Sequence, residues 1–265
     1  MTFDPIPPAA LEFVLQVDRL YAAMVRSAEM REQEPSLGGK LLYAGELGPL
    51  GRALLVAGNI AGAASLAATA DVAAQKQAIR EGVADFLVNS LGEALRILKN
   101  EVRKREAVAV CVAAAPDVVE QEMLERGVSP DLLPPRVDAA AMPAFLPLPR
   151  RIELAPNPGI VVTYRAASAP AQWLPKLDAI ALDCLTTSGD RQAAAARRWL
   201  RLAPRYLGRM AQGLRVFSSS AEAAETFRTR VQSAMDRNEI GVEVEVRLWN
   251  AAEATQLHPS PRAAG

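Results

Sequence analysis

The sequence is poor in the residues that carry much of enzyme chemistry. Its 265 residues include one histidine, His258, and two cysteines, Cys111 and Cys184. Two distant cysteines in apolar surroundings form neither a disulfide framework nor a metal-binding spacing. A single histidine in a proline-flanked tail provides no basis for a Ser-His-Asp triad, a Cys-His pair or a zinc site. We therefore predict no metal site, and the sequence identifies no catalytic residue.

The chain also lacks an excess of either charge and any long apolar run. Lys plus Arg and Asp plus Glu number 30 each. This balance argues against a protein whose main role is to bind nucleic acid, because that role needs a basic surface. No stretch reaches the ~18 consecutive apolar residues of a membrane span. The start, MTFDPIPPAALEF, lacks the basic and apolar regions of a signal peptide. We expect a soluble, cytoplasmic protein with no membrane partner.

Apolar segments alternate with amphipathic segments through the first half of the chain. After a leading helix over 8–32, a strand followed by a helix occurs four times. Apolar strands separated by helices predict an α/β fold with a parallel, Rossmann-like sheet covered on both faces. The predicted strands are 40–44, 63–70, 84–88 and 107–113, and the helices are 51–60, 72–81, 91–105 and a last one from Pro116 to Gly127.

Eight prolines between 130 and 158 mark a change of character, which predicts an extended linker or arm. Beyond it, a smaller α/β region is predicted. The domains are therefore a Rossmann-like domain over 1–133, a proline-rich linker over 134–158 and a C-terminal region over 159–265. In that region we expect strands at 159–165, 214–218 and 241–249, and helices at 170–184, 190–212 and about 220–237.

A glycine-rich turn, Gly45-Glu46-Leu47-Gly48-Pro49-Leu50-Gly51, joins the first predicted strand to its helix. Glycines in such a turn let backbone amides approach a pyrophosphate at a helix N-terminus. The spacing is G-x-x-G-x-x-G, one residue longer than the generic dinucleotide fingerprint, and Pro49 lacks an N–H. The alternative is an ordinary tight turn between a strand and a helix.

Asp71 ends the second predicted strand, 20 residues after Gly51. This is where dinucleotide-binding folds place an acid on the ribose hydroxyls. The alternative is an N-cap of the next helix. The predicted cofactor-binding residues are Gly45, Gly48, Leu50, Gly51 and Asp71.

Seven arginines lie between 191 and 215, and Arg197, Arg201 and Arg205 share one helical face. This segment could bind an anionic ligand, nucleic acid or an acidic partner. The alternative is a solvated helix face, with Pro204 bending or splitting the helix.

Four segments in order, YAGELGPLGRA, SLAATAD, FLVNSLGEALRILKNEVRKREAVAVCV and EMLERGVSPDLL, make residues ~10–133 resemble the central domain of urocanase. The resemblance implies NAD as cofactor, with the nicotinamide acting as an electrophile in the hydration of urocanate. Departures from the family pattern weaken that implication. Thr69 stands where the family has a ribose-binding glutamate, and Ala114 and Ala115 stand where it has Gly-Asn. The family's polar run T-D-Q-T-S-A-H-D meets residues 134–141 here, and its flanking catalytic domain has no counterpart.

Three hypotheses follow. The first is a urocanase-like protein with a degenerate NAD- or nucleotide-binding core and no urocanate hydratase activity. The second is an active lyase, hydratase or other enzyme on the same fold. The third is a structural scaffold that forms homo-oligomers and binds no ligand.

Overall fold

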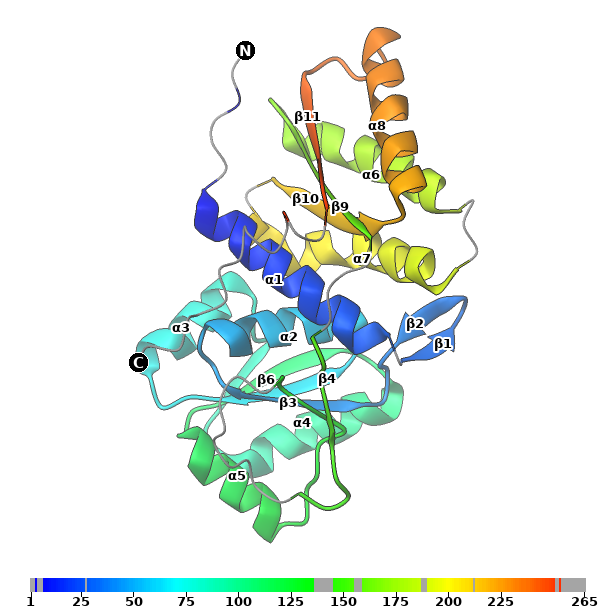
Figure 1. Ribbon diagram of the computed structural model, residues 1–265. Helices are drawn as coiled ribbons and strands as arrows, with labels where there is room; N and C mark the ends of the chain where they lie inside the picture. Colours follow the sequence, from blue (N-terminus) through cyan, green and yellow to red (C-terminus); the bar gives the residue numbers. More distant parts are fainter. Residues whose placement is uncertain are drawn as a thin grey trace. The chain divides into compact units, whose positions relative to one another are not determined.

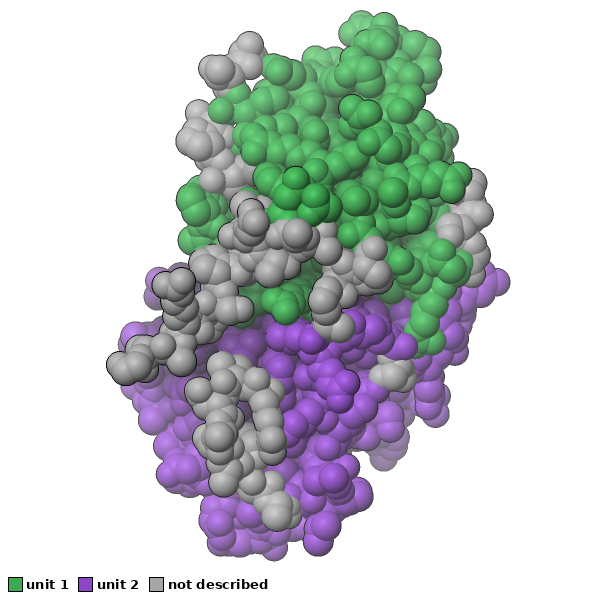
Figure 2. Space-filling model, in the orientation of Figure 1, with its two compact units in different colours: residues 1–19, 156–265 green, residues 20–155 purple. Residues whose placement is uncertain are grey.

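The computed structural model describes residues 3, 7–26, 28–135, 145–154, 159–186, 190–211, 213–250 and 253. The chain forms two compact units (Figure 2). Unit 1 comprises residues 1–19 and 156–265, and unit 2 comprises residues 20–155. The division between them falls inside helix α1, Pro8–Val25. No helix among the described residues is long and apolar enough to cross a membrane.

Unit 2 is built on a six-stranded parallel sheet in the order β5-β6-β4-β3-β7-β8. This confirms the predicted α/β, Rossmann-like fold. The central strands β4 and β6 are buried along their whole length, as expected of a parallel sheet covered on both faces. The strands are β3 (Leu41–Glu46), β4 (Ala64–Ala68), β5 (Phe86–Val88), β6 (Val108–Val112), β7 (Leu132–Leu133) and β8 (Arg150–Arg151).

Helices cover both faces of this sheet (Figure 1). α2 (Pro49–Ala61) and α3 (Val72–Glu81) lie on one face, and α4 (Leu91–Lys104) and α5 (Pro116–Glu125) lie on the other. On the second face Tyr43, Leu66 and Val110 pack with the apolar sides of α4 and α5 in one core. The sequence placed all four helices because each shows apolar residues at helical spacing next to a turn residue.

One prediction about this part of the chain is wrong. The leading helix does not run to residue 32, because α1 ends at Val25 and a hairpin follows, β1 (Glu29–Arg31) with β2 (Glu34–Ser36). Glu32 and Gln33 take positive φ values of 47° and 67°, the conformation of a two-residue hairpin turn. Residues such as Glu, Met, Arg and Gln are good helix formers, so composition alone favoured a longer helix.

Within the proline-rich span, residues 132–133 and 150–151 form β7 and β8, the last two strands in the order of the sheet, and residues 136–144 and 155–158 of the predicted linker or arm lie outside the described residues. Asp131 fixes this pairing. Its carboxylate accepts a 2.8 Å hydrogen bond from the Leu41 amide, and its carbonyl accepts one from the Arg150 amide at 3.0 Å. Strands of two residues between prolines are too short to show a period-2 pattern.

Unit 1 contains an antiparallel sheet in the order β10-β9-β11. Tyr164, Phe217 and Phe227 pack against one another in its core, with ring centroids 5.0–6.1 Å apart. The elements follow the predicted order: β9 (Ile160–Ala166), α6 (Pro170–Thr186), α7 (Arg191–Leu207), the 3-10 helix η1 (Gly208–Ala211), β10 (Arg215–Ser219), α8 (Ala221–Asp236) and β11 (Val244–Trp249).

Candidate functional site

The carboxyl edge of the parallel sheet contains a topological switch point. β3 and β7 are neighbours, but the chain leaves β3 toward β4 on one side and leaves β7 toward β8 on the other. Connections that depart in opposite directions leave a crevice outside the strand ends, which is where open α/β sheets bind ligands. The glycine turn follows β3 and therefore lies at this edge.

The three glycines of the turn do three different things. Gly45 has a φ of +74°, which disfavours any residue with a side chain. Gly51 lies so close to the end of β3 that a Cβ added there would be 2.0 Å from the Glu46 carbonyl oxygen. This glycine lets α2 pack closely against its strand, the role of the last glycine in dinucleotide-binding turns.

Gly48 differs from the other two. It has extended backbone angles, φ −81° and ψ −167°, which any residue can adopt. A Cβ added to it would meet no atom within 4 Å. Neither conformation nor packing within the chain therefore requires a glycine here. The open space in front of its backbone would allow another molecule to approach closely.

The N-terminus of α2 is free of side-chain capping. Gly48 is its N-cap and Pro49 its first residue, so the first amides inside the helix belong to half-buried Leu50 and buried Gly51. A helix leaves its first amides without intrahelical partners, and these carry partial positive charge. α5 begins in the same way, with Ala115 as N-cap and Pro116 as first residue.

Among the described residues, four other helices have an N-cap residue whose side chain accepts a hydrogen bond, unlike α2 and α5. Asp71, Ser90, Asp190 and Ser220 each accept a hydrogen bond from the first turn of α3, α4, α7 and α8. The two uncapped starts both follow central strands of the sheet, β3 and β6. The two helix starts that have no side-chain cap, those of α2 and α5, are thus found at the carboxyl edge of the parallel sheet.

The predicted ribose acid, Asp71, is engaged in local structure. Its Oδ1 accepts the Ala73 amide at 2.8 Å, and its own amide donates to Thr69 Oγ1 at 3.2 Å. Thr69 is buried, and its carbonyl accepts Gln75 Nε2 at 2.9 Å. Asp71 itself is exposed at the end of β4. It performs the capping role, and its contact with a ribose stays a prediction.

A tyrosine–carboxylate pair lies close to the glycine turn and was missed from the sequence. The Tyr43 hydroxyl donates to Glu120 Oε1 at 2.9 Å, joining β3 to α5. Burial raises the pKa of Tyr43, and the charges of Glu120, Glu46 and Asp117 raise that pKa further. Burial also raises the pKa of the Glu120 carboxyl. A polar group in the apolar run KLLYA was the available signal, but its partner lies 77 residues away.

The remaining reactive residues do not assemble a site. Cys111 is buried in β6, and burial raises the pKa of its thiol to about 11, so it is not a thiolate nucleophile at neutral pH. Cys184 is buried in α6. His258 lies outside the described residues. Among the described residues no group of three His, Cys, Asp or Glu side chains could hold a metal ion.

Several residues of the arginine-rich segment bind within unit 1. The Arg197 guanidinium donates to the Leu185 carbonyl at 2.9 Å, Arg215 Nε donates to Asp178 Oδ2 at 3.3 Å, and Arg205 lies over the Tyr206 ring. Pro204 does not split the predicted helix, since α7 continues to Leu207.

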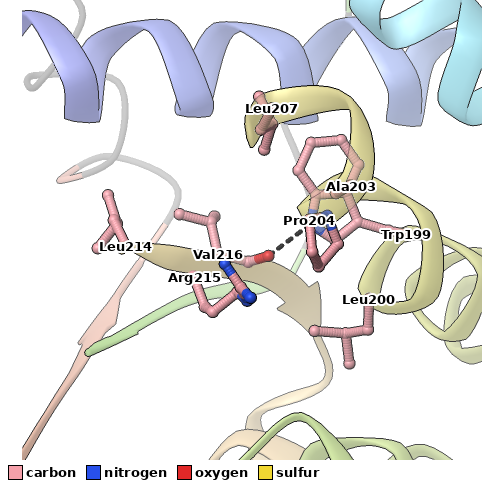
Figure 3. Close-up of a pocket in the computed structure, with 8 residues that line it drawn as sticks. All are labelled: Trp199, Leu200, Ala203, Pro204, Leu207, Leu214, Arg215 and Val216. Carbon is pink, nitrogen blue, oxygen red and sulfur yellow. Dashed lines mark hydrogen bonds between the residues drawn. The ribbon is translucent and has the colours of Figure 1, made fainter. Parts of the chain in front are cut away.

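A small pocket lies between α7 and β10 (Figure 3). Trp199 crosses one side of it and donates its indole N–H to the Val216 carbonyl. The free space has room for about one water molecule, so this pocket is too small for an organic ligand.

Comparison with known protein families decides the relationship. The Urocanase Rossmann-like domain matches residues 19–151, half of the chain. The chain belongs to the urocanase family. The match begins inside α1 and ends at Arg151, so it spans all six strands of the parallel sheet, including β7 and β8. The suspected resemblance is confirmed, and it extends further along the chain than the sequence motifs indicated.

Proposed function

We propose that this urocanase-family protein binds NAD through its diphosphate at the β3–α2 turn and does not hydrate urocanate. The urocanase Rossmann-like domain is associated with NAD binding. The observation that supports retention of the site is Gly48, a glycine that the fold itself does not need. A pyrophosphate oxygen beside the helix start gives a reason for it, because a side chain there would block the approach.

The residues present fit the diphosphate better than the rest of the cofactor. In this proposal the backbone amides of Leu50 and Gly51 donate to phosphate oxygens, and exposed Asp71 accepts from a ribose hydroxyl. Against this, the carboxylates of Glu46, Asp117 and Glu120 lie near the same edge. Like charge near a diphosphate weakens binding, so we expect a lower affinity than a basic site would give.

The proposed loss of urocanate hydratase activity is argued from the side chains that follow the strands of the parallel sheet. When NAD is bound, its nicotinamide supplies the electrophile for urocanate hydration in this family. The protein must then hold the ring and bind the carboxylate and imidazole of urocanate with fixed polar groups. Thr69 is buried and bonded to the Asp71 amide, and Ala114 and Ala115 have no polar side-chain atoms.

Calorimetric titration of the full chain with NAD tests the binding. We expect saturable 1:1 binding, lost in Gly48→Val while the thermal unfolding midpoint stays within a few degrees. Gly92→Val in the first turn of α4 is the matched control, because its Cβ meets the flexible Arg126 guanidinium at 3.5 Å and Ser90 Oγ at an ordinary contact distance of 3.9 Å. Absence of an NAD signal in the unchanged protein, or equal affinity in Gly48→Val, would overturn the proposal.

A separate assay tests the lost reaction. Urocanate is incubated with the protein and saturating NAD, and its ultraviolet absorbance is followed. We expect no decrease above the protein-free rate. Protein-dependent turnover would refute the claim about hydration and leave the claim about binding intact.

A further inference from the structure

The two edges of the parallel sheet differ in chemistry. β8, at one edge, consists of Arg150 and Arg151 and directly follows Pro149. Charged residues and proline are the usual means by which proteins prevent an edge strand from pairing with another chain. β5, at the other edge, reads Phe86-Leu87-Val88 and has no charge, proline or bulge within it.

β5 is apolar and exposed on both faces. Phe86 stands opposite Val110, whose side chain belongs to the α4–α5 core, while Leu87 stands opposite Cys111 on the neighbouring register position. The two side chains therefore point to opposite faces of the sheet. Phe86 is 48% exposed and Leu87 is 40% exposed. Strands of a parallel sheet are normally buried on both faces, so among the described residues this edge lacks the cover that the central strands β4 and β6 have.

The helices beside β5 extend this apolar edge. Ile79 of α3 is also exposed, and Ile97 of α4 is only partly buried against the core. Together with β5 they form what we term the β5 edge: Ile79, Phe86, Leu87, Val88 and Ile97. Among the described residues, no strand pairs with the outer side of β5. An edge strand flanked by apolar side chains on both faces is suited to pairing with another strand.

We propose that the β5 edge is a self-association surface, on which two copies of this chain pair their β5 strands antiparallel about a twofold axis. With the axis at Leu87, Phe86 of one copy stands opposite Val88 of the other. An isologous contact of this kind is self-complementary, because each copy presents the same patch in reversed direction. The two six-stranded sheets then continue into each other.

The charges on α4 select a second copy as the partner. α4 has Glu93 in its first turn and two cations, Arg103 and Lys104, in its last turn, where Lys104 also pairs with Glu101 at 2.9 Å. It contacts β5 and begins three residues after that strand ends, so its amino end lies at the carboxyl end of β5. Antiparallel pairing of two β5 strands therefore places the acidic end of each α4 toward the basic end of the other. This complementarity favours the reversed arrangement over a parallel one.

Sedimentation equilibrium of the full chain over a range of concentrations tests the proposal. We expect a monomer–dimer equilibrium, with Leu87→Lys weakening dimerisation by about 100-fold or more, since two lysines would then face each other near the axis. Val118→Lys is the matched control, because Val118 is an exposed valine on α5, away from the β5 edge, and its replacement should leave the equilibrium unchanged. Circular dichroism checks that both variants are folded.

A charge exchange keeps the test independent of folding defects. Glu93→Lys should weaken the dimer about tenfold, and adding Arg103→Glu to the same chain should restore it, because the paired ends again carry opposite charge. A wild-type chain that stays monomeric up to about 100 µM would overturn the proposal. A dimer that is indifferent to Leu87→Lys, or that the charge exchange fails to restore, would overturn it equally.

Discussion

The two units use their polar groups in opposite ways. Unit 2 leaves the start of α2 at the carboxyl edge of its sheet without a side-chain cap, because the N-cap residue is Gly48. In unit 1, by contrast, several buried or half-buried polar side chains bind one another. The Tyr164 hydroxyl donates to Asp178, whose other oxygen accepts Arg215, and the Ser218 hydroxyl donates to Asp18 at 2.8 Å.

This difference indicates where a ligand can act. Buried polar groups that are bonded to each other have little capacity left for a ligand, whereas first-turn amides that no side chain caps keep theirs. The comparison therefore favours unit 2 as the binding part and unit 1 as a part stabilised by internal pairs. The predictions below break one unit at a time. All three tryptophans, at 173, 199 and 249, lie in unit 1, so tryptophan fluorescence monitors that unit alone.

The largest effect is expected from Gly51→Val. Its Cβ would lie 2.0 Å from a backbone oxygen, so α2 or the end of β3 must move. We expect a loss of more than about 4 kcal/mol in the free energy of unfolding of unit 2, in the range of exceptional single substitutions. Denaturant unfolding followed by circular dichroism measures this. Unfolding of unit 2 at lower denaturant, with the tryptophan transition less affected, is the expected pattern, and a stability like that of Gly48→Val would contradict it.

Arg215→Met should destabilise unit 1. Burial raises the pKa of Asp178, and Arg215 opposes that rise, so removing the guanidinium leaves a buried carboxylate with only the Tyr164 hydroxyl. We expect a loss of about 2–4 kcal/mol in the tryptophan-monitored unfolding transition at neutral pH. Adding Asp178→Asn to the same chain should recover part of the lost stability, because position 178 then carries no buried negative charge. Arg209→Met on exposed η1 is the control and should change stability by less than about 0.5 kcal/mol.

The last prediction is a gain in stability, where the other two are losses. Burial raises the pKa of Asp18 from 3.8 to about 6, with the Ser218 hydroxyl bond opposing the rise. The folded protein then binds a proton that the unfolded chain releases between these values. The contribution of Asp18 to stability therefore falls as pH rises from about 4 to 6 and stays low above it.

Asp18→Asn should remove this dependence, because the amide oxygen still accepts the Ser218 hydroxyl and carries no charge. We expect the variant to be more stable than the unchanged protein by about 3 kcal/mol at pH 7.5 and nearly equal at pH 4, since the pKa rises from 3.8 to about 6 and one pKa unit corresponds to about 1.4 kcal/mol. Thermal unfolding across this range measures it. A stability difference that does not change with pH would show that burial of the carboxylate is not its cause.

Local patterns in the sequence predicted much of unit 2. Buried strands such as 107–113 and capped helices such as α4 are recognisable from a few adjacent residues, and Ser90 Oγ does accept the Glu93 amide at 3.3 Å. In the reciprocal bond the Glu93 carboxylate accepts from the Asn89 amide, which lies one residue before the amide that a capping box would use. Contacts distant in sequence were not predictable, among them Tyr43–Glu120 and the Asp131 pairing that adds β7 and β8.

The sequence by itself determined the family, the α/β alternation and the position of the glycine turn, because these depend on periodicity and on residue types within a few positions of each other. It could not distinguish the three glycines. Only the tertiary structure decided that Gly45 serves a positive φ, that Gly51 serves close packing, and that Gly48 faces open space. Those roles depend on how closely the end of β3 approaches α2 in space, and the amino-acid sequence does not specify that distance directly.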